Sequence, residues 1–230
     1  MKALWFSGGK DSMACLLLHQ HELADIHVIW ANTGRYFPEA LAFVESARDM
    51  CPRWHEVRTD RIGQWAANGL PSDIVPIDHT TLGQFITRPK AVKVQSYLGC
   101  CYENITAPLV ARTRELGLTT IIRGQRTEES HRTPDGTFDG LTFIHPIKDW
   151  TADEVLAYLR ERMQLPEHFA LEHSSMDCFD CTAFAGKSAD RAAYMRQRHP
   201  ERYAEYRARI AELTSTFQTS LNAYQVIEHG

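Results

Sequence analysis

Residues 3–12 constrain the fold of this chain more than any other stretch of its sequence. Residues 3–6 form an apolar run of the kind found in buried strands, and the hexapeptide Ser-Gly-Gly-Lys-Asp-Ser follows directly at residues 7–12. The residues after Ser12 are apolar and have helical character. The pattern therefore predicts a strand, a tight turn and a helix, which is the repeating unit of α/β proteins.

A turn of this kind suits a phosphate group. It directs free backbone N–H groups and the positive end of the helix dipole at one place. The two glycines let an anion approach the backbone, and Lys10 adds a positive charge. Asp11 would repel a phosphate, so we expect it to cap the helix or to help hold a metal ion. The predicted binding residues are Ser7, Gly8, Gly9, Lys10, Asp11 and Ser12.

The hexapeptide differs from the Walker A motif, which requires four residues between its first glycine and the Gly-Lys pair. It resembles the PP-loop of the ATP-pyrophosphatase superfamily, a motif that binds the phosphates of an adenine nucleotide. A generic glycine-rich turn with a surface lysine is the alternative interpretation.

The composition fits an ordinary protein with one sizeable core. The chain has 230 residues, of which 23% are charged, and its formal net charge of −4 gives no general sign of affinity for nucleic acids. No apolar run approaches the length of a membrane span and no signal peptide precedes the first strand, so we expect a cytoplasmic protein with no membrane partner. Six cysteines in such a chain indicate thiol, metal or catalytic chemistry rather than disulfides.

Strand and helix signals alternate along most of the chain. Strands are predicted at residues 26–31, 54–59 and 119–123, and helices at residues 38–50, 100–116 and from 151 onward; Phe143 and Ile144 begin a short segment that Pro146 ends. Pro108 must kink or divide the second helix, while Thr151 and Glu154 form a capping box at the start of the third. The alternation implies a parallel sheet with helices on both faces, which binds ligands beyond the carboxyl ends of its strands. Residues 60–95 give no clear pattern.

The sequence becomes polar, helical and rich in Arg and Ala near residue 186. We therefore predict a nucleotide-binding domain with a metal site at residues 1–185 and a helical extension at residues 186–230. One apolar stripe of the extension consists of Tyr203, Tyr206, Ile210 and Leu213. Its basic residues are Lys187, Arg191, Arg196, Arg198, Arg202, Arg207 and Arg209. They form either a solvated face or dimer contact, or a surface for nucleic-acid phosphates.

Four cysteines occur in two pairs, the adjacent Cys100 and Cys101 and the Cys-x-x-Cys of Cys178 and Cys181. Four thiolates can hold zinc or an iron–sulfur cluster. Zinc prefers pairs separated by two to four residues, whereas adjacent side chains diverge by about 100° on a helix, so the set favours a [4Fe–4S] cluster. The alternative is that one pair is a redox dithiol or consists of buried apolar thiols.

Beyond the PP-loop, four segments match motifs that occur together in one protein family. They are Asn32-Thr33-Gly34 with Phe37-Pro38-Glu39, Gly124-Gln125-Arg126 with Glu129-Ser130 and Arg132, His145-Pro146-Ile147 with Asp149-Trp150, and Cys178 to Thr182. With them the chain resembles the sulfonucleotide reductases, which are the adenylylsulfate and phosphoadenylylsulfate reductases and their relatives. The match spreads over residues 3–184, and the tandem cysteines resemble the cluster-bearing, adenylylsulfate-type branch.

The resemblance implies a parallel five-stranded sheet with helices on both faces and an adenine nucleotide at the PP-loop. It extends the predicted nucleotide site to Thr33, Gly34, Gly124 and Arg126. Arg126 and Arg132 follow a strand, and their guanidinium groups suit the distal phosphate or sulfate, although ion pairs with Glu128 and Glu129 are the alternative. The predicted catalytic residues are Lys10, Arg126 and Arg132.

The chain also departs from the family in two places. These reductases carry a C-terminal Glu-Cys-Gly-Leu/Ile-His segment, whose cysteine attacks the sulfate sulfur and carries a thiosulfonate intermediate. Here no cysteine follows Cys181, and Asn32 replaces an Asp of the family motif. The nucleotide and cluster sites are thus kept, while the reductive half of the reaction is lost or supplied elsewhere.

Three functions remain as hypotheses. The first is an enzyme that splits ATP between its α and β phosphates, with Mg²⁺, to make an adenylylated acceptor open to attack by sulfur; a nucleic acid is one such acceptor, and a separate sulfur donor is implied. The second is a sulfonucleotide reductase that takes its thiol from a thioredoxin-like partner and releases sulfite. The third is a sensor or subunit that binds nucleotide and cluster without catalysis. A homo-oligomer is compatible with all three.

Overall fold

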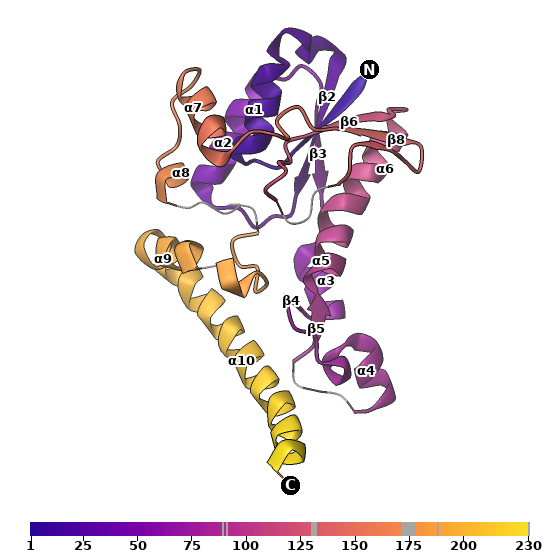
Figure 1. Ribbon diagram of the computed structural model, residues 1–230, viewed down its shortest axis with the longest axis vertical. Coiled ribbons are helices and arrows are strands. Elements are labelled where there is room, and N and C mark those ends of the chain that lie inside the picture. The colour runs from indigo at the N-terminus through magenta and orange to yellow at the C-terminus, as the bar shows by residue number, and fades with distance from the viewer. Residues whose placement is uncertain (89, 91, 130–132, 172–177, 188, 230) are drawn as a thin grey trace. The chain divides into compact units, whose positions relative to one another are not determined.

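The computed structural model describes residues 1–88, 90, 92–129, 133–171, 178–187 and 189–229 (Figure 1). The chain forms two compact units, and each unit is assembled from two stretches of sequence. The first unit contains Met1–Thr59 and Ile105–Cys178, and the second contains Asp60–Asn104 and Phe179–Gly230.

The first unit is built on a six-stranded sheet with the strand order β3-β2-β1-β6-β8-β7 (Figure 1). The strands are β1 (Lys2–Phe6), β2 (Ile26–Asn32), β3 (Trp54–Arg58), β6 (Thr120–Arg123), β7 (Gly136–Phe138) and β8 (Leu141–Ile144). The first five strands in this order run parallel, and β7 pairs antiparallel with β8 at the edge. The predicted five-stranded parallel sheet is therefore confirmed, and a hairpin adds a sixth strand.

Helices cover both faces of this sheet, as predicted. They are α1 (Lys10–Leu18), α2 (Pro38–Asp49), α6 (Ala107–Glu115), α7 (Ala152–Arg160) and α8 (His168–Leu171), with a 3-10 helix at Gln20–Asp25. On one face Leu109 of α6 joins a buried cluster with Trp5, Ile29 and Ile121, and α1, α2 and α7 lie on the other face (Figure 1). Because both faces are buried, the central strands are almost continuously apolar.

Prolines fix two helix starts. Pro38 lies in the first turn of α2 and Pro108 in the first turn of α6, where a missing N–H costs nothing. The helix predicted over residues 100–116 is accordingly divided into α5 (Tyr97–Cys101), a π-helical turn (Tyr102–Thr106) and α6. No non-helical residue separates these segments, so Pro108 does not end the helix; the π-helical turn just before it accommodates the missing N–H.

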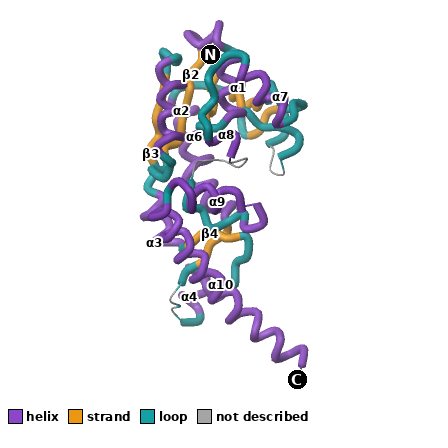
Figure 2. The backbone as a smooth tube through the Cα atoms, turned by 90° about the vertical axis from the view of Figure 1, so that its left-hand side faces the viewer, coloured by secondary structure: helices purple, strands orange, loops and turns teal. Residues whose placement is uncertain are grey.

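The second unit contains the residues that gave no clear sequence pattern. Residues 60–104 form α3 (Arg61–Asn68), a 3-10 turn (Ile77–His79), α4 (Thr81–Ile86), α5 and a separate parallel pair, β4 (Leu70–Ser72) with β5 (Val94–Ser96). The later stretch forms a 3-10 turn (Ala185–Lys187), α9 (Ala189–Arg198) and the long α10 (Pro200–His229) (Figure 2). On the predicted stripe of α10, Tyr206 and Leu213 are buried.

The domain boundary at residues 185 and 186 stays a prediction. The two compact units divide the chain differently, since residues 60–104 pack with the C-terminal stretch and not with the large sheet. None of the described helices is both long and apolar enough to span a bilayer.

The capping box at the start of α7 gives a test of local structure. The Thr151 hydroxyl accepts from the Glu154 N–H at 3.2 Å, and the Glu154 carboxylate accepts from the Thr151 N–H at 2.7 Å. Thr151→Ala should lower the free energy of unfolding in urea by about 1 kcal/mol. Thr151→Ser keeps the hydroxyl that accepts the hydrogen bond, so its free energy of unfolding should fall by less. An equal fall in both variants would contradict the capping role.

Candidate functional site

The strand order creates a switch point at β1. This strand pairs with β2 on one side and with β6 on the other, so the connections that leave the carboxyl ends of β1 and β6 diverge there. Crevices of this kind are where open α/β sheets bind ligands. The turn at residues 7–12 follows β1, and Gly124 to Arg126 follow β6. The fold therefore brings the first and third sequence motifs to one edge of the sheet.

The turn after β1 has the geometry that its sequence predicts. Gly8 has a φ of 81°, and a Cβ atom there would meet Val44 Cγ2 at 2.9 Å, so glycine is required. The Ser12 hydroxyl closes the turn: it accepts from the Ser7 N–H at 3.2 Å and donates to the Gly9 carbonyl at 2.9 Å. No side chain caps the start of α1, which leaves its first N–H groups available to an anion.

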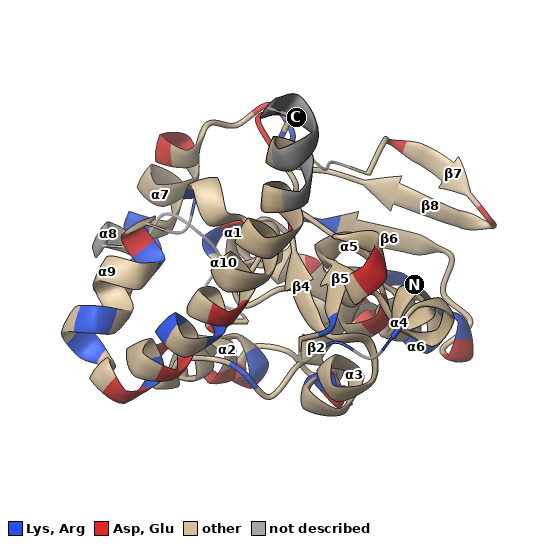
Figure 3. Ribbon diagram, turned by 90° about the horizontal axis from the view of Figure 1, so that it is seen from below, with Lys and Arg blue, Asp and Glu red and all other residues tan. Residues whose placement is uncertain are grey.

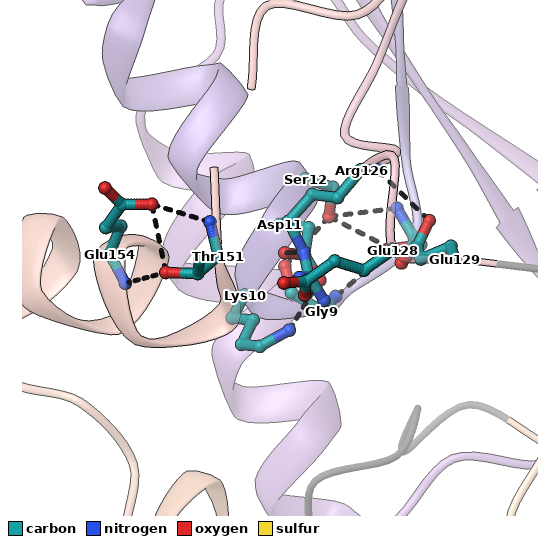
Figure 4. Close-up of polar contacts among 10 residues, drawn as sticks. Gly9, Lys10, Asp11, Ser12, Arg126, Glu128, Glu129, Thr151 and Glu154 are labelled. Carbon is teal, nitrogen blue, oxygen red and sulfur yellow. Dashed lines mark hydrogen bonds and ion pairs between the residues drawn. The ribbon is translucent and has the colours of Figure 1, made fainter. Parts of the chain in front are cut away.

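Two cations converge on the Asp11 carboxylate (Figure 4). Lys10 Nζ lies 2.7 Å from Asp11 Oδ2, and Arg126 Nε lies 2.8 Å from Asp11 Oδ1. Arg126 is only 7% exposed, and it also contacts Glu128 at 2.7 Å. Asp11 thus does not cap the helix, which was one of our two expectations, but it ties the β1 turn to the β6 loop.

The site contains carboxylates as well as the two cations. Burial raises the pKa of Glu129, and the neighbouring Asp11 raises it further, while Arg126 and Lys10 act in the opposite direction. Burial lowers the pKa of Arg126, but Asp11 and the two glutamates outweigh it, so the net shift is upward. The guanidinium therefore stays charged, and the site combines two cations with carboxylates that can assist a metal ion.

Gly124 allows the two loops to meet. A Cβ atom at this position would lie 2.5 Å from the backbone carbon of Asp11 and 2.7 Å from the Ser12 nitrogen. Real Cβ atoms do not approach a backbone so closely, so only glycine lets the end of β6 pack on the first turn of α1.

The segment after β2 lies beside the turn in the sheet, since Phe6 is in register with Trp30. Thr33 is buried, and the Asn32 amide accepts from the Gly34 N–H at 2.8 Å and donates to Glu56 at 2.7 Å. An Asp at position 32 could accept from Gly34 but could not donate to Glu56. The amide of Asn32 is therefore matched to its neighbour on β3.

A family model described as the phosphoadenosine phosphosulfate reductase domain matches residues 2–184. The chain belongs to the phosphoadenosine phosphosulfate reductase family. The suspected resemblance is thereby confirmed, and the family's chemistry combines a nucleotide with sulfur. A search of proteins of curated function finds no significant match.

Two solved structures are similar to this family member. A phosphoadenylyl-sulfate (PAPS) reductase from Candida auris, in a phosphate complex, has 16% identity and a TM-score of 0.47, covering 73% of this chain and 77% of its own. A predicted subunit of a tRNA methyltransferase from Methanocaldococcus jannaschii has 16% identity and a TM-score of 0.41, covering 88% of this chain and 92% of its own.

The structure describes all but one of the predicted site residues. Arg132 lies outside the described residues. Arg123, the last residue of β6, packs over the Trp5 ring at 5.2 Å, and burial lowers its pKa to about 10. Trp150 contacts Tyr158 edge-on at 5.2 Å, which supports a packing role. The assignments of Lys10, Arg126 and the turn residues as binding residues stay predictions.

The paired cysteines have different surroundings. Cys100, Cys101 and Cys181 belong to the second unit, whereas Cys178 ends the first. Trp65 Nε1 donates to Cys100 Sγ at 3.3 Å. Burial raises the pKa of the Cys100 and Cys181 thiols, and the nearby Arg61 acts against it.

No group of three or more His, Cys, Asp or Glu side chains is placed to hold a metal ion in the described part of the chain. Cys178 Sγ instead donates to Thr33 Oγ1 at 3.7 Å, within the first unit. Burial raises the pKa of Cys15 to about 12 and that of Cys51 to about 11, which fits structural roles for both. The four-cysteine [4Fe–4S] site is thus not shown and stays a prediction.

Sequence reasoning missed a buried ion network in the second unit. The Asp180 carboxylate is fully buried, and it accepts from Arg61 and from Arg209 Nη1, the latter at 2.6 Å. Arg191 donates to the Cys181 carbonyl at 3.1 Å, and the Arg202 guanidinium lies 4.5 Å from the Phe179 ring centroid. The one available signal was a charged residue between the two cysteines of the Cys-x-x-Cys motif.

This network changes the interpretation of the basic C-terminal helices. Arg191, Arg202 and Arg209 contact residues 179–181, so they are part of the packing of the second unit. The basic residues of α9 and α10 are all Arg, and Asp190, Glu201, Glu205 and Glu212 lie among them (Figure 3). Arg196, Arg198 and Arg207 are exposed, so a nucleic-acid surface on these helices stays a prediction.

The pairing of Asn32 with Glu56 predicts a pH-dependent variant. Burial raises the pKa of Glu56, but hydrogen bonds from Asn32 and Arg58 lower it more. In Asn32→Asp two carboxyl groups face each other, so their folded-state pKa values rise and the folded form binds more protons. The variant should lose about 1 kcal/mol of stability at pH 7 and little near pH 4, because stability falls as pH rises through the raised pKa values.

Urea unfolding at both pH values measures this effect. The double variant Asn32→Asp with Glu56→Gln is the matched control, because the Gln amide can donate to the new carboxylate. It should recover most of the loss at pH 7. A loss that is the same at both pH values, or that Glu56→Gln does not relieve, would contradict the charge argument.

Proposed function

We propose that this family member binds the phosphates of an adenine nucleotide at the turn of residues 7–12. One observation carries the proposal: Lys10 and Arg126 converge on a single carboxylate in front of the uncapped start of α1. In the absence of a nucleotide the Asp11 carboxylate is the anion that these cations hold. A phosphate oxygen has the charge and the acceptor geometry to take part of that place.

The reaction that we favour is cleavage of ATP between its α and β phosphates. A nucleophilic oxygen of an acceptor attacks the α phosphorus, pyrophosphate leaves, and the adenylylated acceptor can then be attacked by a sulfur nucleophile with loss of AMP. Mg²⁺ would neutralise charge on the phosphates. In nucleotide sites this ion usually binds one or two carboxylates together with the phosphates, and Asp11 and Glu129 would supply those carboxylates. Lys10 and the α1 N–H groups hold the phosphates, and Arg126 holds the distal group.

A second candidate is supported by the family itself. In a sulfonucleotide reductase with an external thiol, the thiolate attacks the sulfate sulfur, and AMP leaves from adenylylsulfate or adenosine 3′,5′-bisphosphate from phosphoadenylylsulfate. A second thiol of the same thioredoxin-like partner then releases sulfite and forms a disulfide. The chain lacks a cysteine after Cys181, so this route requires that partner. Release of sulfite from adenylylsulfate or phosphoadenylylsulfate, against release of pyrophosphate from ATP, distinguishes the two reactions.

Five further features also remain proposals: the [4Fe–4S] cluster, the sulfur donor, a nucleic-acid acceptor, self-association and a cytoplasmic location. The thiols present are the right donors for a cluster, but the described residues form no metal-holding group, so we derive no step through it. Anaerobic purification followed by iron and sulfide analysis, with Cys181→Ser as the comparison, tests the cluster directly.

Replacing Lys10 tests the phosphate site. Lys10→Gln removes a charge-assisted contact and should weaken nucleotide binding about tenfold or more in calorimetric titration. Lys2→Gln, which removes an exposed lysine paired with Glu22, is the control and should bind as the unchanged protein does. Equal affinities in all three proteins would refute the phosphate site.

Replacing Asp11 separates the two reactions. If Asp11 helps hold Mg²⁺, Asp11→Asn should weaken binding of Mg·ATP about tenfold. The same variant should bind adenylylsulfate without metal as tightly as before or more tightly, since a competing carboxylate is gone. Glu22→Gln controls for the change in charge. Equal weakening toward both nucleotides would mean that Asp11 only positions Arg126.

A further inference from the structure

A row of nitrogen groups lies at the amino ends of β2 and β3, the edge of the sheet opposite to the phosphate turn. Arg53 Nη1 lies 3.2 Å from His27 Nε2, and His27 Nδ1 lies 2.9 Å from His55 Nε2. His55 Nδ1 in turn lies 3.2 Å from Arg112 Nη2. The two imidazole rings are stacked with their centroids 5.1 Å apart.

The fold explains why these four residues meet. His27 and Ile29 are two residues apart on β2, so their side chains lie on the same face of the sheet. This is the face that α6 covers. Arg112 belongs to α6, and His55 lies on β3 next to β2. All four side chains are half-buried and belong to the first unit.

The hydrogen bonds of this row cannot all form. A neutral imidazole has one N–H and one lone pair, and an arginine can only donate. If His27 Nε2 and His55 Nδ1 accept from the arginines, both rings carry their protons on the nitrogens that face each other 2.9 Å apart. Moving a proton, or adding one, places an N–H against an arginine. Every protonation state therefore leaves two donors opposed, and the row lacks an acceptor.

The row also carries excess positive charge. Arg53 has no carboxylate partner among the described residues, and its other contact is Met1 Sδ at 2.9 Å. Arg112 pairs with Glu115 at 3.0 Å. Burial lowers the pKa of His27, and Arg53, the chain's amino group and Arg112 lower it further. A cation would be repelled here, whereas an anion would be attracted.

We propose that Arg53, His27, His55 and Arg112 bind a tetrahedral oxyanion, either sulfate or phosphate. An anionic oxygen beside the row accepts from the arginines and offsets their charges, and a ring that turns its opposed N–H toward the anion gains the acceptor that the row lacks. The site is independent of the proposed nucleotide site, because it occupies the other edge of the sheet. Sulfate binding should strengthen from pH 7.5 to pH 6, since this anion keeps its charge over that range and favours protonated histidines.

Histidine NMR on ¹⁵N-labelled protein tests this site with inorganic phosphate and sodium sulfate as probes. The protein carries Lys10→Gln so that the phosphate turn does not compete. Each salt should shift the His27 and His55 ring signals in a saturable way, while sodium chloride at equal ionic strength should not. His27→Gln and His55→Gln assign the signals.

Arginine variants then show which groups hold the anion. Arg53→Gln should weaken the phosphate response about tenfold. Arg58→Gln, which replaces the exposed arginine at the end of β3, should leave it unchanged. Arg112→Gln repeats the test if circular dichroism shows that Arg53→Gln is unfolded. The proposal fails if neither salt gives a saturable shift, if chloride gives the same shift, or if a folded arginine variant responds like the parent protein.

Discussion

The ion pairs of Asp11 hold the candidate site together. Its carboxylate contacts Lys10 from the turn after β1 and Arg126 from the loop after β6, so one anion ties the two connections that diverge at the switch point. Gly124 lets these connections approach, because any Cβ atom there would collide with the backbone of α1. Removing a buried ionic partner leaves the other charge uncompensated, which explains why the loop geometry depends on this contact.

The same contact links structure to function. In the proposed nucleotide site a phosphate would compete with the Asp11 carboxylate for two cations, so binding would exchange one anion for another. The carboxylates around Arg126 would oppose a bare anion, and they suit a phosphate that arrives with Mg²⁺. This balance of charge is the physical reason for preferring ATP over a sulfonucleotide. Membership in the phosphoadenosine phosphosulfate reductase family fits both substrates.

The two units use charge in different ways. In the first, Lys10 and Arg126 lie at the carboxyl ends of the strands and pair with Asp11. In the second, the fully buried Asp180 carboxylate pairs with Arg61 and Arg209, and these ion pairs are part of the packing of the unit. Three of the basic residues that suggested a nucleic-acid surface, Arg191, Arg202 and Arg209, contact the protein's own residues 179–181.

The sequence alone determined the parallel sheet and the turn after β1. Both depend on local features, namely apolar runs bounded by glycines and a capping box at Thr151, which act within a few residues. Only the tertiary structure decided that Asp11 contacts Arg126, that residues 60–104 join the C-terminal helices, and that His27 meets His55. These contacts join residues far apart in the chain, and their partners are selected by packing and strand order, which no local pattern encodes.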